Sequence, residues 1–346
     1  MISKSLYRHI SKASLPLINP TRQPTASFHH ARPLAMKVAH VTSWGLPPVF
    51  ATAADPPAPS PSQLQLKVVA VGVPRAVQGR AAGLHSSSVN APLPFDPSAD
   101  GVGLEEATGD LYYVGDLTAN LFAEKANVER DTLVKLDPGT DAVAVAGLSN
   151  PVASSWMALR CRAVGGCEGR TVLVFGATGA SGRMAVGVAR ALGAARVIGV
   201  GRSADTLAAV KGLDERILLS DPFEVPPHIG PVHIVLDFVG GQAAEGVLKT
   251  AEAPVGEDLQ YIHIGDLGGR EDIVVSGGLL NKKPFRIMGS GMGSWSRMEM
   301  KKEIPGLVAA VSKMQRPDDV WTAPLSDVQS VWDTEDAKKR RLVLIP

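Results

Sequence analysis

A glycine-rich turn carries the most specific chemical pattern in this chain. Residues 171–175 form an apolar, β-branched run of the kind that is buried on both faces of a parallel sheet. Ala177, Gly179 and Gly182 follow with the spacing G-x-G-x-x-G, in which alanine replaces the first glycine. Small residues let the backbone turn tightly, and a helix predicted from about residue 180 to 192 would direct its free N–H groups at a bound anion. The strand, the turn, the helix and a second strand together predict a site for the pyrophosphate of a dinucleotide.

The residue that follows the second strand selects the dinucleotide. Proteins that bind NAD in this way place Asp or Glu there to bind the ribose 2′-hydroxyl, whereas a 2′-phosphate calls for a cation. This chain has Arg202 and Ser203, and no acid before Asp205. The planar guanidinium of Arg202 can bind a phosphate through two hydrogen bonds, and Ser203 adds a hydroxyl. The alternative is that Arg202 is a solvated surface residue, but the pattern favours NADPH as the cofactor.

Composition limits the remaining interpretation. The chain has 346 residues, enough for two domains of ordinary size, and a formal net charge of +1 that gives no electrostatic reason to expect a nucleic acid partner. No uninterrupted apolar run approaches about 18 residues, so no membrane span is predicted. Cys161 and Cys167 are the two cysteines, too few for a disulfide framework and compatible with a reducing compartment.

Residues 1–35 differ in composition from the rest of the chain. They are basic and contain no Asp or Glu. Apolar and basic side chains recur there at intervals of four residues: Ile2, Leu6 and Ile10, and Lys4, Arg8 and Lys12. A basic amphipathic helix without acids predicts a mitochondrial transit peptide. The alternatives are a disordered tail or a true start at Met36, and with such a start we expect a cytoplasmic protein.

The part of the chain before the glycine turn is predicted to be rich in β-strands. Strands are expected at residues 36–41, 64–73, 111–114 and 132–136, which suits a small irregular β-barrel. Residues 55–62 are rich in proline and are predicted to be a loop rather than a linker, because the strands on its two sides are expected to pair with each other.

The part after the turn alternates strands with helices. Strands are expected at residues 217–219, 234–237, 259–264, 285–288 and 341–346, and helices at 242–250 and 303–314. This alternation predicts a doubly wound parallel sheet, the α/β architecture of dinucleotide-binding domains.

Five segments match, in order and spacing, the motifs of one known family. They are residues 93–103, which are similar to a Pro-x-x-Pro-Gly-x-Asp-Gly-x-Gly signature, then 150–159, the glycine turn, 235–241 and 341–346. From residue 36 to 346 the chain resembles the medium-chain dehydrogenases/reductases, specifically their zinc-free quinone oxidoreductase branch. The resemblance implies a Rossmann sheet inserted in a GroES-like β-barrel catalytic domain.

The resemblance also implies a domain organisation. The catalytic, substrate-binding domain would cover residues 36–147 and the NADPH-binding Rossmann domain 148–290. Residues 291–346 would return to the catalytic domain. Relatives commonly form homodimers through an edge strand of the Rossmann sheet, here residues 285–288.

The residues argue directly against a zinc site. A catalytic zinc needs three protein ligands and a structural one usually needs four thiolates. Zinc-dependent relatives carry Gly-His-Glu where this chain has Ala99, Asp100 and Gly101, and residues 36–150 contain no cysteine. No metal site is therefore predicted.

Without a Lewis acid, the expected acceptor is one that is already electrophilic. The resemblance implies NADPH-dependent reduction of a quinone or of the C=C bond of an α,β-unsaturated carbonyl. Val239, Gly240, Ile264 and Gly265 would lie near the nicotinamide ribose. The full set of predicted cofactor residues is Gly176, Ala177, Thr178, Gly179, Ala180, Ser181, Gly182, Arg202, Ser203, Val239, Gly240, Ile264 and Gly265.

The group that stabilises the reacting oxygen is less well defined. Many relatives have Asn in a Gly-Val-Asn-Pro pattern, where this chain has Pro74, which offers no side-chain hydrogen bond. His85 is the catalytic candidate, because it falls near a tyrosine that lines the substrate cleft in relatives; the alternative is a solvated loop histidine. Further candidates are Tyr112, Tyr113 and residues 86–88. Asp100 is predicted to hold the loop of its glycine-rich signature.

Two other interpretations stay open. The glycine turn also resembles that of atypical short-chain reductases, although no Tyr-x-x-x-Lys pair occurs in this chain. The second is a non-catalytic NADPH-binding sensor or structural relative, because a fold by itself does not establish catalysis.

Overall fold

The computed structural model describes residues 35–265, 272–291 and 293–346. The predicted transit peptide, apart from its last residue, lies outside the described residues.

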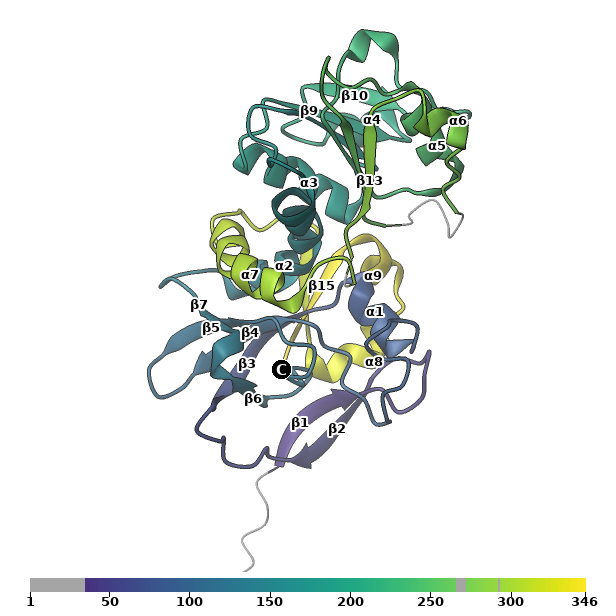
Figure 1. The fold of residues 1–346 in the computed structure, drawn as a ribbon. Coiled ribbons are helices and arrows are strands. Elements are labelled where there is room, and N and C mark those ends of the chain that lie inside the picture. Colours follow the sequence, from purple (N-terminus) through teal and green to yellow (C-terminus); the bar gives the residue numbers. More distant parts are fainter. Residues whose placement is uncertain (1–34, 266–271, 292) are drawn as a thin grey trace, which may run out of the picture. The chain divides into compact units, whose positions relative to one another are not determined.

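A six-stranded parallel sheet forms the Rossmann part of the fold (Figure 1). Its strands are β8 (Thr171–Phe175), β9 (Arg196–Gly201), β10 (Glu215–Leu218), β11 (Ile234–Asp237), β12 (Leu259–His263) and β13 (Phe285–Gly289). The spatial order is β10-β9-β8-β11-β12-β13. The chain therefore winds outward from β8 in one direction and then from β11 in the other, which makes a topological switch point between these two strands.

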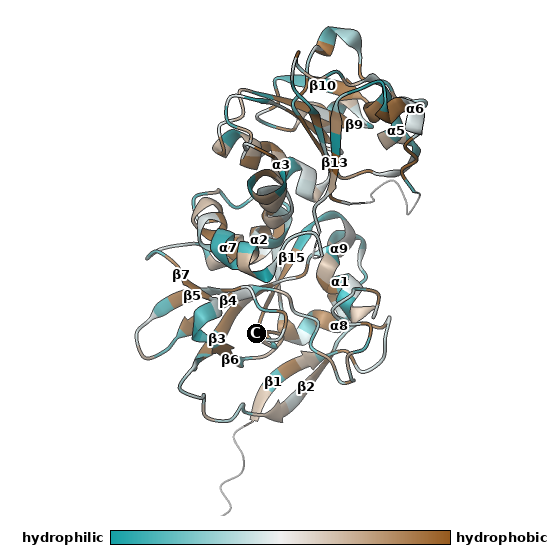
Figure 2. Cartoon of the chain, in the orientation of Figure 1, coloured by the Kyte–Doolittle hydropathy of each residue, from teal (hydrophilic) through white to brown (hydrophobic). Residues whose placement is uncertain are grey.

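The strands are apolar because helices cover both faces of this sheet. Val172 and Val174 of β8 belong to the apolar cluster that includes α2 (Ala142–Met157) and α3 (Ala180–Ala191). Leu173 and Phe175 belong to the cluster on the α5 side (Gly241–Thr250). Figure 2 shows hydrophobic residues along these strands. Two short helices, α4 (Ala204–Ala208) and α6 (Gly277–Leu280), follow β9 and precede β13.

A second, seven-stranded sheet contains strands from both ends of the described chain. It consists of β3 (Gln63–Gly72), β4 (Gly101–Glu105), β5 (Asp110–Val114), β6 (Lys125–Glu129), β7 (Leu133–Lys135), β14 (Val320–Pro324) and β15 (Arg341–Ile345). Because β15 pairs antiparallel with β3, the C-terminal segment returns to the sheet of the first half. The predicted α/β fold, a Rossmann sheet inserted in a barrel-like β-domain, is confirmed.

One predicted pairing is wrong. Strand β1 (Ala35–His40) pairs antiparallel with β2 (Val49–Ala54) in a separate two-stranded sheet, not with β3. Strand β2 lies before the proline-rich loop and is a strand that the sequence patterns did not predict. The loop therefore connects two sheets and does not join paired strands.

Helix α2 is largely buried and contacts both the seven-stranded sheet and helices of the Rossmann part. It starts at Asp141, whose side chain accepts hydrogen bonds from the N–H groups of Val143 and Ala144, and it continues into a π-helical turn, Ala158–Arg162. Together these form the one described helix that is long and apolar enough to cross a membrane, but 67% of its most apolar window is buried inside the protein. Since it packs against β3, α3 and α7 (Arg297–Val311), we interpret it as a core helix.

The remaining helices of the described residues are short. They are α1 (Arg75–Ala81), α8 (Val328–Val331) and α9 (Glu335–Lys339), with 3-10 turns at Arg130–Thr132, Pro227–Ile229 and Leu325–Asp327.

Candidate cofactor site

The glycine turn between β8 and α3 is tight and is fastened to the neighbouring strand. Gly176 has a φ of 95°, a conformation that favours glycine. The N–H groups of Gly176 and Ala177 both donate to the carbonyl oxygen of Val200 in β9, at 3.0 and 2.9 Å. Gly179 then donates to the carbonyl of Gly176 at 3.1 Å. The chain therefore turns sharply over residues 176–179, and the backbone of this turn stays close to the carboxyl end of β8.

The third small position of the motif admits no side chain. A Cβ atom on Gly182 would lie 2.1 Å from the carbonyl oxygen of Gly176. Such a contact is far inside van der Waals distance, and its partner is a backbone atom that cannot rotate away. Gly182 is therefore required for the close packing of α3 on the turn, which is the role that the motif predicts.

Two glycines of β9, which the sequence analysis did not single out, shape the other side of the turn. A Cβ on Gly199 would lie 2.5 Å from Cδ1 of Leu213 and 3.1 Å from the Cβ of Ala177, and one on Gly201 would lie 2.8 Å from Cγ2 of Thr178. Because β9 presents glycine at these places, the turn can carry Ala177 where relatives of the motif have glycine. The alternation Gly-Val-Gly at residues 199–201 was the available sequence signal.

The start of α3 offers backbone N–H groups to an anion. Gly179 is the N-cap and provides no side-chain cap, and the N–H of Arg183 makes the first helical hydrogen bond, to Gly179 at 2.9 Å. Helix geometry therefore leaves the N–H groups of Ala180, Ser181 and Gly182 without helical partners. Together with the helix dipole, these groups suit a pyrophosphate.

Two arginines add positive charge beside this helix start. Arg341, at the beginning of β15, donates to the carbonyl of Ala180 at 3.3 Å and pairs with Asp319 at 2.5 Å. Arg183 pairs with the other carboxylate oxygen of Asp319 at 3.0 Å. Since two cations share one carboxylate, the cluster keeps a net positive charge, which favours an anionic cofactor. By its place in the sequence, Arg341 is recognisable only as part of a strand.

Arg202 and Ser203 lie where the sequence predicts, directly after β9. Ser203 is the N-cap of α4, and its hydroxyl oxygen accepts a hydrogen bond from the N–H of Thr206 at 3.4 Å. The hydroxyl hydrogen of Ser203 stays able to donate. The Arg202 side chain is exposed, and no hydrogen bond or ion pair from it to another described residue is found. Its guanidinium is therefore available for a phosphate.

The remaining predicted residues lie at the ends of β11 and β12. Gly240 has a φ of 71°, and its N–H and that of Val239 donate to Oδ1 of Asp237 at 3.0 and 2.8 Å. Ile264 donates its N–H to the carbonyl of Asp237 at 2.8 Å, and Gly265 follows it. Asp237 is in register with Phe175 on one side and His263 on the other. The structure therefore brings the predicted cofactor loops to the carboxyl ends of the parallel strands, on both sides of the switch point.

Asp237 organises this end of the sheet, a role that its place in the motif at residues 235–241 did not predict. Its side chain is fully buried, and its Oδ2 accepts a hydrogen bond from the Tyr261 hydroxyl at 2.7 Å and lies 2.8 Å from Nδ1 of His263. Burial raises the pKa of Tyr261 far above its usual range, and the negative charge of Asp237 adds a smaller effect in the same direction. The Asp237 carboxylate thus ties the Val239–Gly240 turn to β12. The available signal was an acidic residue at the end of an otherwise apolar strand.

His85 lies on the loop that follows α1, in the part of the chain that contributes strands to the seven-stranded sheet, and Pro74 is the N-cap of α1. The Nδ1 atom of His85 is 2.8 Å from the hydroxyl oxygen of Ser87. No hydrogen bond or ion pair between His85 and the cofactor loops is found among the described residues. Its catalytic role stays a prediction. Of the further candidates, Tyr112 donates to Glu105 at 3.3 Å, Tyr113 donates to Asp100 at 3.2 Å and Ser88 donates to the carbonyl oxygen of His85 at 3.0 Å.

The signature loop at residues 93–103 is held by Asp96 and not by Asp100. Asp96 accepts hydrogen bonds from the N–H groups of Ser98 at 2.8 Å and Phe122 at 2.9 Å. Asp100 instead accepts the Tyr113 hydroxyl, and its Oδ1 is buried with no hydrogen-bond partner in the described structure. Asp100 is therefore structural, as predicted, but it binds Tyr113 of β5, whereas the backbone N–H groups in and beside the loop bind Asp96. Burial raises the pKa of Asp100 to about 7, against the smaller opposing effect of the Tyr113 hydrogen bond.

Replacing Asp100 by asparagine is expected to stabilise the protein above pH 7 and to change its stability little near pH 4. In the parent, the unfolded chain loses the Asp100 proton near the ordinary aspartate pKa of 3.8, whereas the folded protein keeps it until about pH 7. Unfolding releases a proton in that window, so stability falls with rising pH by at most about 1.4 kcal/mol per unit. Urea unfolding of both proteins across this window measures the difference. The exposed Asp318→Asn is the control, and parallel curves for parent and Asp100→Asn would contradict the assignment.

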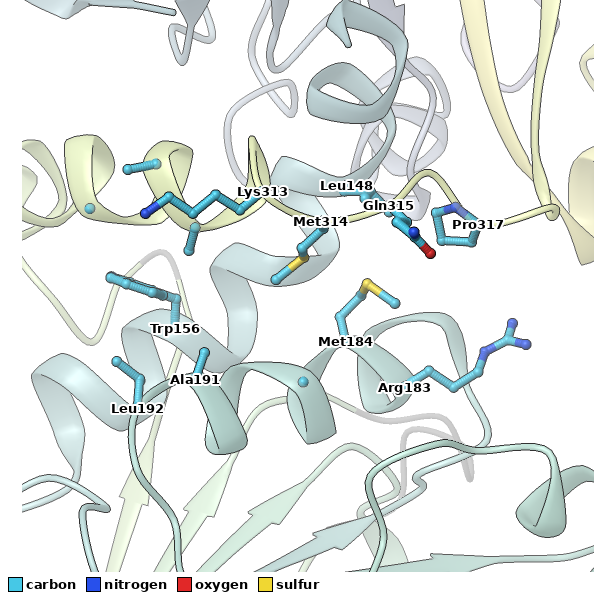
Figure 3. Close-up of a pocket in the computed structure, with 14 residues that line it drawn as sticks. Leu148, Trp156, Arg183, Met184, Ala191, Leu192, Lys313, Met314, Gln315 and Pro317 are labelled. Atoms are coloured by element: carbon cyan, nitrogen blue, oxygen red, sulfur yellow. The ribbon is translucent and has the colours of Figure 1, made fainter. Parts of the chain in front are cut away.

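A pocket of about 610 Å³ lies between α2, α3 and α7 (Figure 3). Its walls are mainly apolar and include Trp156, Met184 and Met314, with Arg183 and Lys313 also lining it. It contains none of the predicted cofactor residues. Arg183, which belongs to the cationic cluster beside the start of α3, also lines the pocket, so the pocket adjoins this cluster.

Among the described residues, no group of three or more His, Cys, Asp or Glu side chains is arranged to hold a metal ion. The two cysteines are free thiols, with Cys167 buried and Cys161 partly so.

Comparison with known proteins identifies the family. No family model matches the chain. A probable NADPH-dependent quinone reductase of Emericella nidulans is 45% identical in an alignment that covers 90% of this chain and 100% of that protein. An acryloyl-coenzyme A reductase of Sulfurisphaera tokodaii is 37% identical over 134 residues, 37% of this chain and 38% of that protein.

Solved structures support the same fold. The quinone oxidoreductase of Thermus thermophilus matches with a TM-score of 0.71 at 24% identity, over 90% of this chain and 100% of that one. A mycobacterial quinone oxidoreductase matches with a TM-score of 0.71 at 21% identity, with the same coverage. Given the Rossmann edge, the returning C-terminal strands and the extended identity to a quinone reductase, the chain belongs to the medium-chain dehydrogenase/reductase superfamily, in its quinone oxidoreductase-like branch.

Proposed function

We propose that this protein is an NADPH-dependent oxidoreductase that transfers hydride, without zinc, to a quinone or to the C=C bond of an α,β-unsaturated carbonyl. The observation that carries the proposal is that the glycine turn, the exposed Arg202 and the Val239–Gly240 turn all follow the carboxyl ends of neighbouring parallel strands. The name of the Emericella nidulans relative supports a quinone, and that of the Sulfurisphaera tokodaii relative supports an activated C=C bond.

Each part of the edge has a distinct task in this proposal. The N–H groups at the start of α3 would bind the pyrophosphate, and Arg202 and Ser203 would bind the 2′-phosphate. The turns at Val239 and Ile264 would orient the nicotinamide ring, which would supply the hydride when the cofactor is bound. A quinone or an enone is electrophilic by itself, so the protein has to orient it, exclude water and stabilise the oxygen that becomes negative. His85 is the proposed hydrogen-bond donor to that oxygen.

Oxidation of NADPH, followed by its absorbance, tests the activity. The purified protein is supplied in turn with 1,4-benzoquinone, 1,4-naphthoquinone and a small enal, and flavin-free, enzyme-free mixtures are the controls. We expect turnover with at least one acceptor and a preference for NADPH over NADH. Tight NADPH binding without turnover on the whole panel would favour the non-catalytic sensor.

Zinc independence is tested separately. We expect elemental analysis of the purified protein to find less than stoichiometric zinc, and treatment with a chelator to leave the rate of NADPH oxidation unchanged, because no ligand set for zinc is predicted. One tightly held zinc ion per chain, or a rate that falls with the chelator and returns with zinc, would refute this part of the proposal.

Two further proposals concern the context of the enzyme. Residues 1–35 are proposed to direct the protein to mitochondria, which microscopy of a fluorescent fusion with and without these residues would test.

Strand β13 forms an edge of the Rossmann sheet among the described strands, so it is proposed to pair with its copy in a homodimer. A monomeric mass in solution would contradict the dimer.

A further inference from the structure

A buried arginine supports the loop that carries His85. Arg80, in α1, is 1% exposed. Its guanidinium donates hydrogen bonds to the carbonyl oxygens of Pro97 at 2.9 Å and Leu117 at 2.8 Å, and to the hydroxyl oxygen of Ser87 at 2.5 Å. The guanidinium also lies 5.0 Å from the centre of the Phe95 ring. So many fixed contacts hold Arg80, and through it Ser87, in one position.

The direction of each hydrogen bond follows from the chemistry of the groups. A guanidinium has donors and no acceptor, so the Ser87 oxygen must accept from Arg80. The hydrogen of the Ser87 hydroxyl is then free to point at Nδ1 of His85, 2.8 Å away. The backbone N–H of Ser87 donates to the same Nδ1 at 3.2 Å. A backbone N–H can only donate, so this contact gives Nδ1 the acceptor role, with a lone pair and no proton, and the Ser87 hydroxyl then donates to the same atom.

The surroundings of His85 also disfavour its charged form. Partial burial lowers the pKa of His85, and the positive charge of Arg80 lowers it further. The charge of Asp96 opposes the effect of burial on the pKa of Arg80, which keeps the Arg80 charge in place beside His85. A neutral imidazole whose Nδ1 is an acceptor carries its proton on Nε2.

We propose that Arg80 and Ser87 are positioning residues that hold His85 as a neutral imidazole, with Nε2–H directed at the oxygen of the acceptor. This inference rests on the proposed function and assigns the tautomer, the charge and the role of His85 within it. A neutral donor of this kind stays available throughout the neutral pH range, whereas an imidazolium would be lost.

The reaction balances without a proton from His85. NADPH, when bound, would supply the hydride with both electrons of one nicotinamide C–H bond and would be left as NADP⁺. The hydride would form a new C–H bond at a carbon of the acceptor, and the π-electron pair of the acceptor would move to its carbonyl oxygen. Nε2–H donates a hydrogen bond to that oxyanion and keeps its proton, and water then protonates the product. Removing one such donor costs about 100-fold or more in rate in other enzymes.

The tautomer can be measured without any activity. In the full-length protein labelled with ¹⁵N-histidine, the His85 signals are assigned by their loss in His85→Gln. We expect the shifts of a neutral Nε2–H ring at pH 7. In Ser87→Ala we expect a weaker preference for this tautomer, and in Ser87→Thr, which keeps the hydroxyl, we expect the parent spectrum. A ring protonated on Nδ1, or on both nitrogens, would overturn the proposal.

Kinetics test the role of the donor. We expect His85→Ala to lower kcat about 100-fold with an unchanged Kd for NADPH, and Ser87→Ala to lower kcat less, with partial return in Ser87→Thr. Between about pH 6 and 8 the parent rate should not follow the titration of a histidine. The exposed Ser326→Ala is the control and should match the parent.

The outcomes separate the two hypotheses. If the parent turns over and His85→Ala turns over equally well, the donor role is wrong while the proposed function stands. If the parent oxidises no NADPH with any acceptor, the proposed function fails and the donor role fails with it, and the ¹⁵N spectrum still decides whether Arg80 and Ser87 set the tautomer.

Discussion

Replacing Gly182 by alanine should abolish NADPH binding at concentrations that saturate the parent. The added Cβ would lie 2.1 Å from the carbonyl oxygen of Gly176, so the turn or the first residues of α3 must move. Overpacking of this kind costs about 1–3 kcal/mol, and the displaced atoms are those that would bind the pyrophosphate. We expect a loss of affinity of about 100-fold in a titration followed by NADPH fluorescence.

Gly187→Ala is the matched control for this change. It lies on the same helix, but a Cβ there would meet no other atom within 4 Å. Its affinity for NADPH should equal that of the parent, and its stability should be equal or slightly higher because alanine favours helix. Circular dichroism of both variants separates a local change from unfolding. Unchanged affinity in a folded Gly182→Ala would show that the glycine turn is not the cofactor site.

The second large effect is expected from Arg202→Ala, which should weaken the binding of NADPH and leave the affinity for NADH nearly unchanged. Arg202 is exposed, and the structure shows no partner for it among the described residues, so its removal breaks no described contact. A hydrogen bond to a charged group contributes about 1.5–3 kcal/mol, which corresponds to roughly 10- to 100-fold in affinity for the phosphate-bearing cofactor. Dissociation constants for both cofactors measure the ratio.

Arg286→Ala is a suitable control, because Arg286 lies near the amino end of β13 and pairs with Asp258 at 2.7 Å, away from the carboxyl ends of the strands. It should affect both cofactors slightly and equally. Equal losses for NADPH and NADH in Arg202→Ala would refute the assignment of Arg202 to the 2′-phosphate.

The local elements around the turn were predictable from the sequence. The prediction of residues 234–237 agrees with β11 (Ile234–Asp237), and a helix from about residue 180 agrees with α3 (Ala180–Ala191). These elements are recognisable because a strand buried on both faces must be apolar throughout, and a helix that begins at a phosphate site must follow small residues. The fold class and the family followed from the order of such motifs.

The side-chain partners were not predictable in the same way. Asp237 binds Tyr261 and His263, which are 24 and 26 residues away in the sequence, and Arg80 reaches Leu117 across 37 residues. Such contacts depend on strand register and on the path of loops, and neither follows from residue spacing. The same reason explains the wrong pairing of β1, whose partner is decided by competition among strands for one another's backbone groups.

By itself, the sequence determined the glycine turn, the cation after the second strand and the α/β order of the elements, because each depends on residues that are close along the chain. The tertiary structure decided that β9 makes room for Ala177, that Asp237 ties two cofactor loops together and that Asp96, not Asp100, holds the signature loop. It also decided the surroundings of His85. These features depend on which distant residues meet in the folded core, where burial makes every unpaired polar group costly.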